Sequence, residues 1–368
     1  MSMRSRLIII VLLFPLLTMA FIAVSPIRLA SEPSLGLLSL IAPEGASTQQ
    51  AAAGIVHEWF REPAPRFRAT SRTAEHVVVM DHRAWRAVQI ADPLRLDRSD
   101  AGAVTLIDGT PAVLRAGHAP VRLVSQPAAV LRGNQVFAID RDGSGFAWLD
   151  GSMEVAGQIR LAGPIVALET SPGHVWVADA LGFVYLFDGS EAEQAGELVS
   201  LRRPSIESQG AVYGLSVNPD GRAAVVEGLH PTRVAILRRG GEDIISREVM
   251  RLDSSMNRSR HITWVSDDLL LETESGVARI DAGSGDITHR ELPGRVVGLG
   301  WLESLDLLLV LTDSYASDAR SRLHILYADD LSELSTLVFP AAAYSLSYDG
   351  RLVSIGLEEV VLLYEFSD

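Results

Sequence analysis

The sequence predicts an all-β protein whose strands form a β-propeller. From about residue 66 onward, short β-branched and aromatic runs alternate with Gly, Asp, Asn and Pro turns, without an amphipathic helix pattern of useful length. Many short strands with closely spaced turns are typical of an all-β domain. A unit of four such runs recurs at a spacing of roughly 40 residues, which indicates a propeller built from four-stranded blades.

Each repeating unit can be followed from run to run in the sequence. A small-apolar run, such as V-Y-G-L-S-V at 212–217, leads into a turn, such as N-P-D-G at 218–221. A second and a third apolar run follow, for example at 223–226 and 234–237. Asp-Gly turns between such runs predict hairpins, because Gly accepts positive φ at little cost. The small residues of the first runs fit innermost strands, which must let the blades converge.

We predict seven blades, although six or eight would also fit the spacing. The expected blades cover residues 75–125, 127–161, 164–201, 210–252, 258–292, 296–338 and 341–368. The last blade holds only three runs before the chain ends. We expect residues 66–72 (R-F-R-A-T-S-R) to complete it from the other end of the domain.

Three motifs carry a resemblance to a known group of proteins. They are N-P-D-G-R at 218–222, Y-D-G-R at 348–351 and I-D-A-G-S-G-D at 280–286. With these, residues 66–368 resemble the WD40-like and quinoprotein-like (YVTN-type) seven-bladed propellers of bacterial envelopes. The Trp-Asp dipeptide of true WD40 repeats is missing, and so are the tryptophan-docking repeats of quinone-dependent dehydrogenases. The resemblance implies a fold and leaves the function open, because propellers host enzymes and scaffolds alike.

The N-terminus predicts export. Residues 1–6 carry two arginines and no acid, and residues 7–24 are an uncharged apolar run that reaches the lower limit for crossing a bilayer. Residues 1–25 are therefore a signal peptide or a signal-anchor helix, and the two remain open. Residues 26–65 read as a linker with a short helix at 49–60, which either packs on the propeller or lies on the membrane. We expect the propeller to be extracytoplasmic, anchored to the inner membrane or secreted after cleavage.

Composition excludes several functions. The chain of 368 residues has a net charge of −14, which argues against a nucleic-acid binder because such proteins need a basic surface. Cys is absent, which excludes disulfides, thiolate metal sites and Cys nucleophiles. Lys is absent as well, so every fixed positive side chain is an Arg.

A search for catalytic motifs predicts no catalytic residue, no metal site and no cofactor. The nine histidines are scattered singly, without the spacing of a metal-ligand pair. D-R-D-G-S-G at 140–145 resembles the start of a calcium loop, but a hairpin turn between two strands explains it. The sequence contains neither a Gly-x-Ser-x-Gly elbow nor a phosphate-binding glycine loop.

Basic residues gather in loops that a propeller would place on one face, after its second and fourth strands. The candidate partner-binding residues are Arg202, Arg203, His230, Arg233, Arg251, Arg258, Arg260, His261, Tyr315, Arg320 and Arg322. An acidic protein that collects arginines on one rim is suited to an acidic partner. The alternative is that these long loops are simply polar and solvated.

Two functions remain open from the sequence. The favoured one is a membrane-tethered scaffold that docks other envelope or membrane proteins, with the membrane itself contacted through residues 7–24 if they are not cleaved. The alternative is an extracytoplasmic enzyme, such as a lactonase-like hydrolase or a dehydrogenase, with a metal in the central channel.

Overall fold

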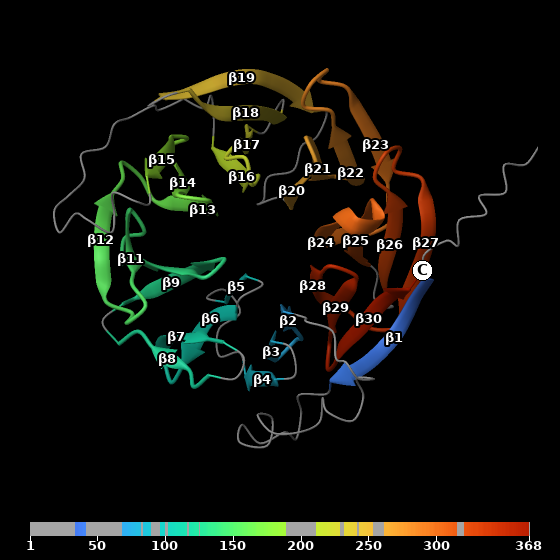
Figure 1. Cartoon of the computed structure of the whole chain (residues 1–368), viewed down its shortest axis with the longest axis horizontal. Coiled ribbons are helices and arrows are strands. Elements are labelled where there is room, and N and C mark those ends of the chain that lie inside the picture. Colours follow the sequence, from blue (N-terminus) through green and yellow to red (C-terminus); the bar gives the residue numbers. More distant parts are fainter. Residues whose placement is uncertain are drawn as a thin grey trace, which may run out of the picture. The chain divides into compact units, whose positions relative to one another are not determined.

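The computed structural model describes residues 34–41, 68–81, 84–89, 96–99, 102–115, 118–124, 126–188, 211–228, 232–240, 243–252, 261–314 and 320–367. Residues 37–365 form one compact unit, and residues 1–36 with 366–368 form another. The larger unit is a β-propeller of eight sheets (Figure 1). The first strands of neighbouring sheets contact one another in a closed cycle: β2, β5, β9, β13, β16, β20, β24, β28 and again β2.

The first four blades come from the first half of the propeller. Blade 1 contains β2 (Arg68–Arg72), β3 (His76–Asp81) and β4 (Ala84–Gln89). Blade 2 contains β5 (Asp97–Ser99), β6 (Gly102–Ile107), β7 (Thr110–Leu114) and β8 (Val121–Arg122). Blade 3 contains β9 (Ala128–Arg132), β10 (Gln135–Ile139), β11 (Gly145–Leu149) and β12 (Val155–Arg160). The described strands of blade 4 are β13 (Ile165–Ser171), β14 (His174–Asp179) and β15 (Val184–Asp188).

The other four blades complete the ring. Blade 5 contains β16 (Val212–Val217), β17 (Ala223–Glu227), β18 (Thr232–Gly240) and β19 (Asp243–Leu252). Blade 6 contains β20 (Ile262–Val265), β21 (Asp268–Thr273), β22 (Gly276–Ile280) and β23 (Ile287–Glu291). Blade 7 contains β24 (Arg295–Leu302), the 3-10 turn η3 (Glu303–Leu305), β25 (Leu307–Asp313), β26 (Ser321–Tyr327) and β27 (Glu333–Phe339). Blade 8 contains β28 (Ala343–Asp349), β29 (Leu352–Leu357), β30 (Val361–Ser367) and β1 (Ser34–Ile41).

The seven-blade prediction was wrong, because the region expected to be one blade at 75–125 is shared by two. Residues 68–89 form blade 1 and residues 97–122 form blade 2. The first strand of blade 2 is only Asp97–Ser99, and its polar residues give no apolar run to mark the start of a blade. The described residues contain no α-helix. The expected helices at 7–24 and 49–60 lie outside the residues that the structure describes.

The N-terminal part of the chain closes the ring, but through a different segment from the one expected. Ser34–Ile41 form β1, which lies beside β30 as the fourth strand of the last blade. Residues 66–72 do not take that place. Instead, Arg68–Arg72 form β2, which packs on β28 and starts blade 1.

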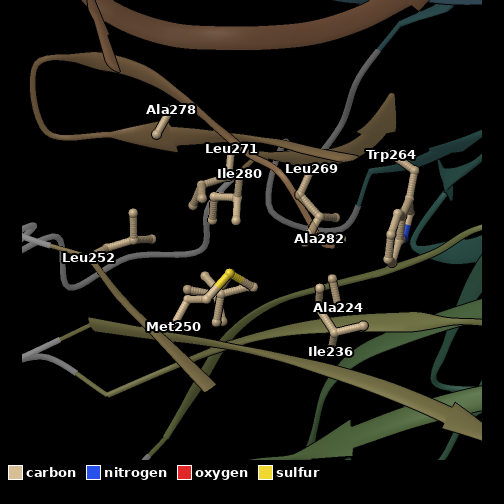
Figure 2. Packing of buried hydrophobic residues seen from close by; sticks show 12 residues of the cluster. Ala224, Ile236, Met250, Leu252, Trp264, Leu269, Leu271, Ala278, Ile280 and Ala282 are labelled. Atoms are coloured by element: carbon tan, nitrogen blue, oxygen red, sulfur yellow. The ribbon is translucent and has the colours of Figure 1, made fainter. Parts of the chain in front are cut away.

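Neighbouring blades pack face to face, and a buried apolar layer separates each consecutive pair from blades 1 and 2 to blades 6 and 7. Figure 2 shows the layer between blades 5 and 6, where Leu269 and Leu271 of β21 meet Ile236 and Met250 of blade 5. The residue between them, Leu270, belongs to the layer shared with blade 7. Side chains alternate between the two faces of a strand, so a second strand that is buried on both faces carries a continuous apolar run, such as L-L-L at 269–271.

Glycines in an inner strand let two blades approach, as the sequence predicts. A Cβ on Gly298 of β24 would lie 2.7 Å from the Cβ of Leu346 in β28, and one on Gly300 would lie 2.5 Å from the ring of Tyr348. The matched order of these pairs shows that β24 and β28 run in the same direction. In blades that run in this direction, every first strand starts on the same face of the ring. Because pairing within blades is antiparallel, second strands end on that face, and so do the fourth strands that lead to the next blade. This face, with the turns after second strands and the links between blades, is here called the connection face. The turns after first strands lie on the other, here called the hairpin face.

Blade 1 runs in the opposite direction to its neighbour. The backbone N–H of Arg68 donates to Asp349 Oδ2 (3.1 Å), and that of Arg72 donates to Ser345 Oγ (2.7 Å), so β2 is antiparallel to β28. Its first turn therefore lies on the connection face, where the Ala74 N–H donates to the carbonyl of Glu358 (3.0 Å). The number of strands explains the reversal. A blade with an odd number of strands starts and ends on opposite faces, and blade 1 has three described strands. Because β5 starts on the connection face, blade 1 must start on the hairpin face.

Candidate functional site: the arginines of the connection face

The structure describes part of the predicted arginine rim. Arg233, Arg251, His261, Arg320 and Arg322 lie at or beside strand ends of blades 5 to 7 on the connection face. The remaining candidates lie outside the described residues: Arg202, Arg203, His230, Arg258, Arg260 and Tyr315. A role in partner binding stays a prediction for all of them.

Two arginines face each other at the edge of blade 5. Arg233 of β18 is directly opposite Arg251 of β19, with Glu227 of β17 on its other side. Like charges in directly opposite positions repel one another. The exposed Arg251 makes no ion pair or hydrogen bond with any described residue that would offset this repulsion. Arg251 is therefore available to a partner's carboxylate.

Blade 7 contributes two more arginines at the start of β26. Arg320 is exposed, and Arg322 is partly buried opposite Thr312 and Val338. Within the described part of the chain, neither guanidinium has an ion-pair partner. Val338 is 55% exposed beside Arg322, so this edge combines positive charge with an apolar contact.

The structure adds Arg72, which the sequence analysis missed. It ends β2 on the connection face, at the seam between blades 8 and 1. Its guanidinium carbon lies 5.6 Å from the ring centroid of Tyr344. Its Nε is buried without a hydrogen-bond partner, and burial lowers the pKa of the guanidinium. The sequence could not have singled it out, because its position depends on the reversal of blade 1.

Two arginines at the strand ends of blades 2 and 3 on the same face are paired with aspartates of their own blades. Arg122, at the end of β8, lies 2.6 Å from Asp108 in the turn after β6. Arg160, at the end of β12, lies 2.5 Å from Asp142 in the turn after β10. Hydrogen bonds from Ser144 lower the pKa of Asp142 to about 2, with a smaller contribution from Arg160. These arginines already have carboxylate partners.

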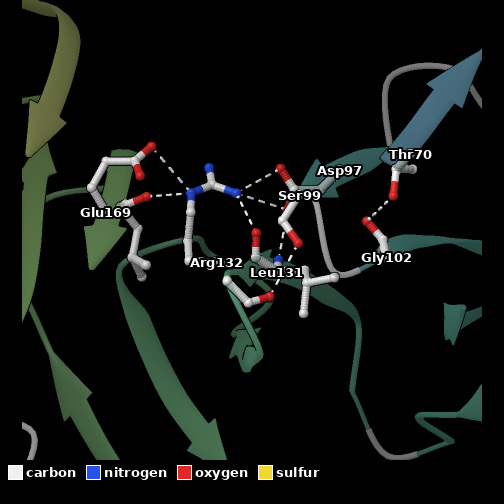
Figure 3. Close-up of polar contacts among 9 residues, drawn as sticks. Thr70, Asp97, Ser99, Gly102, Leu131, Arg132 and Glu169 are labelled. Atoms are coloured by element: carbon white, nitrogen blue, oxygen red, sulfur yellow. Dashed lines mark hydrogen bonds and ion pairs between the residues drawn. The ribbon is translucent and has the colours of Figure 1, made fainter. Parts of the chain in front are cut away.

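A further arginine joins three blades near the hairpin face. Figure 3 shows Arg132 of β9 between Asp97 of β5 and Glu169 of β13. Its Nη1 donates to both oxygens of Asp97 (3.0 and 2.9 Å), and its Nε lies 3.2 Å from Glu169 Oε1. Burial raises the pKa of Glu169. Burial also opposes the charge of Arg132, but Asp97 and Glu169 together raise its pKa. This cluster holds the inner strands of blades 2, 3 and 4 together.

Titratable side chains elsewhere in the described residues are not grouped as metal ligands. Among the described residues, no group of three or more His, Asp and Glu side chains is placed to hold a metal ion. His324 is the most buried described histidine, at 3% exposure. Its Nδ1 lies 3.1 Å from Thr336 Oγ1 and 3.3 Å from Glu333 Oε2, and burial lowers its pKa.

A search for membrane-crossing helices in the part of the chain that the structure describes finds none that is long and apolar enough.

Solved structures share this fold at low sequence identity. BamB from Moraxella catarrhalis matches with a TM-score of 0.55 and 15% identity, over 90% of this chain and 100% of that one. YCF48 bound to D1 peptide matches with a TM-score of 0.50 and 14% identity, over 81% and 98% of the two chains. The extracellular domain of the putative one component system BT4673 from B. thetaiotaomicron gives 0.50 and 12%, over 80% of this chain and 45% of that one. No protein-family model and no curated protein sequence matches the chain. These likenesses show that the fold is a β-propeller.

Proposed function

We propose that this protein is an exported propeller that docks other envelope or membrane proteins on its connection face. The observation that carries the proposal is the positive charge of Arg251, Arg320 and Arg322 on blades 5 and 7, which has no ion-pair partner among the described residues, on a chain of net charge −14. Arginine binds carboxylates through its planar fork, so the expected partner presents acidic side chains.

Export and membrane retention form the second part of the proposal. The basic flank and the apolar run at 7–24 favour an extracytoplasmic location, with retention on the inner membrane where the run is not cleaved. The fold agrees with this location, since it also occurs in an extracellular domain. It agrees with docking as well, because a protein of the same fold was solved with a bound peptide.

Site-specific photo-cross-linking in cells tests the proposal. Amine-reactive cross-linkers are unsuitable because the chain has no Lys. A photoreactive residue placed at Ser275 or Glu358 reports on the connection face, and one at Asn134 or Glu303 reports on the hairpin face; all four positions are exposed turns. We expect the first pair to capture a specific envelope protein. Capture only from the second pair, or no specific capture, would contradict the proposal.

A further inference from the structure

We propose that Arg72 and Tyr344 form a binding site for a carboxylate at the seam between blades 8 and 1. The inference deepens the proposed docking function and rests on it, since it names the group that a partner would place at the inner end of the connection face. It concerns residues outside the predicted rim.

The main chain around Arg72 is fully engaged, which fixes the side chain in place. The Arg72 N–H donates to Ser345 Oγ (2.7 Å), and the same hydroxyl donates to the Arg72 carbonyl (3.1 Å). Two residues further along each strand, Ser347 Oγ donates to the carbonyl of Thr70 (2.7 Å). These hydrogen bonds hold β2 against β28, so the guanidinium starts from a rigid position. Rigidity lowers the entropy cost of binding a ligand.

No carboxylate among the described residues forms an ion pair with the guanidinium. Its one described contact is the ring of Tyr344, which attracts a cation through its π-face but carries no negative charge. Its Nε has neither solvent nor a hydrogen-bond partner. The exposed acids in the neighbouring turn, Glu358 and Glu359, make no ion pair with it. Taking a charge out of water without a partner is costly, and an incoming anion would offset that cost.

The geometry favours a carboxylate over an apolar or cationic group. Nη1 and Nη2 remain as donors without described acceptors, and a guanidinium presents such donors as a fork that matches two carboxylate oxygens. The guanidinium carbon lies over the ring of Tyr344, so we expect a ligand to reach the N–H donors from the side away from that ring. A carboxylate could come from an acidic side chain or from a C-terminus.

Peptide binding to the purified full-length chain tests the site and separates these two sources. One probe is acetylated hexaglutamate with an amidated C-terminus, and the other is acetylated hexaserine with a free C-terminus; amidated hexaserine is the blank. We expect one of the two carboxylate probes to bind and the blank not to bind. Arg72→Gln should weaken that binding about 10-fold or more, and Arg72→Lys should weaken it less, because it keeps the charge but loses the fork.

Arg160→Gln is the matched control, since it also removes one arginine from the connection face but from an existing pair. An equal loss in Arg160→Gln and Arg72→Gln would overturn the inference in favour of diffuse attraction, as would unchanged binding in Arg72→Gln. The thermal midpoint without peptide gives a second reading: Arg72→Gln should unfold at the same or a higher temperature, because it removes an unpaired, partly buried charge. A lower midpoint with unchanged binding would mark Arg72 as structural. The two proposals can fail separately. If Arg72→Gln loses peptide binding but no protein is cross-linked from Ser275 or Glu358 in cells, the carboxylate site stands and only the docking function is contradicted.

Discussion

Two groups of arginines share the connection face but differ in their surroundings: one lies at strand ends of blades 2 and 3, and the other lies on blades 5 and 7 and at the seam. Arg122 and Arg160 lie within 2.6 Å of aspartates from their own blades. Arg251, Arg320, Arg322 and Arg72 have no ion-pair partner among the described residues. The same residue type therefore closes turns in Arg122 and Arg160 and leaves charge available to a partner in the second group. Side-chain pairing, which sequence composition does not report, distinguishes the two groups.

The largest effect is expected where an arginine is paired and buried. Arg132→Met should lower the free energy of unfolding by about 3 kcal/mol, because it leaves Asp97 and Glu169 facing each other without a cation. Denaturant unfolding measures the change, and the exposed pair of Arg160 supplies the control. Equal losses in Arg132→Met and Arg160→Met would contradict the role given to the interior cluster.

A smaller effect is expected at the seam that carries Arg72. Ser345→Ala should cost about 2 kcal/mol, since it leaves the Arg72 N–H without its acceptor in a packed interface. Thermal unfolding reports the loss. Ser332→Ala, in an exposed turn of blade 7, should change stability far less, and a comparable loss there would show that the seam hydroxyl is not special.

His324 should make stability depend on pH in a way that involves the unpaired Arg322. Burial lowers the folded-state pKa of His324 below the ordinary 6.5, with a smaller contribution from the charge of Arg322. The unfolded chain then binds the proton more readily, so this contribution is complete above pH 6.5 and is lost as pH falls through the folded pKa.

Titration of the His324 ring by NMR measures this directly. We expect Arg322→Gln to raise its pKa and His324→Gln to reduce the loss of stability below pH 6.5. A pKa of His324 above 6.5 in the folded protein would refute the assignment of His324 as a buried neutral histidine.

The smallest effect is expected at the exposed pairs. Arg122→Gln should change the free energy of unfolding by no more than about 0.5 kcal/mol, because exposed ion pairs gain little in water. Chemical unfolding of this variant beside Asp108→Asn gives the measurement. A loss of several kcal/mol in either variant would show that these pairs do more than close turns.

Local patterns in the sequence predict the propeller, but not its closure. Hairpins such as 212–226 were recognisable because Asp-Gly turns separate apolar runs. A further signal, an acidic residue at or within one position of the end of the second strand, occurs in every blade: Asp81, Asp108, Asp140, Asp179, Glu227, Glu272, Asp313 and Glu358. It places Asp81 and Asp108 in separate blades, although third strands such as Val184–Asp188 can end on an acidic residue as well.

Other features depend on contacts between distant segments. The strand at 34–41 is apolar enough to be a strand anywhere, and only its pairing with β30 assigns it to the last blade. Blade 1 is reversed because its described part has an odd number of strands, three, and the sequence does not show how many strands this blade has. Arg72 reaches the connection face only because of that reversal. The sequence therefore predicts rim arginines in loops, but it does not predict one at the end of a strand.

Binding of the captured partner to two charge-matched double variants tests the central claim most directly. Arg320→Gln with Arg322→Gln removes two unpaired arginines, and Arg122→Gln with Arg160→Gln removes two paired ones from the same face. The pairing account predicts about 10-fold or greater weakening for the first variant, with near wild-type affinity for the second. Equal weakening in both would contradict it, because net charge alone would then explain the binding.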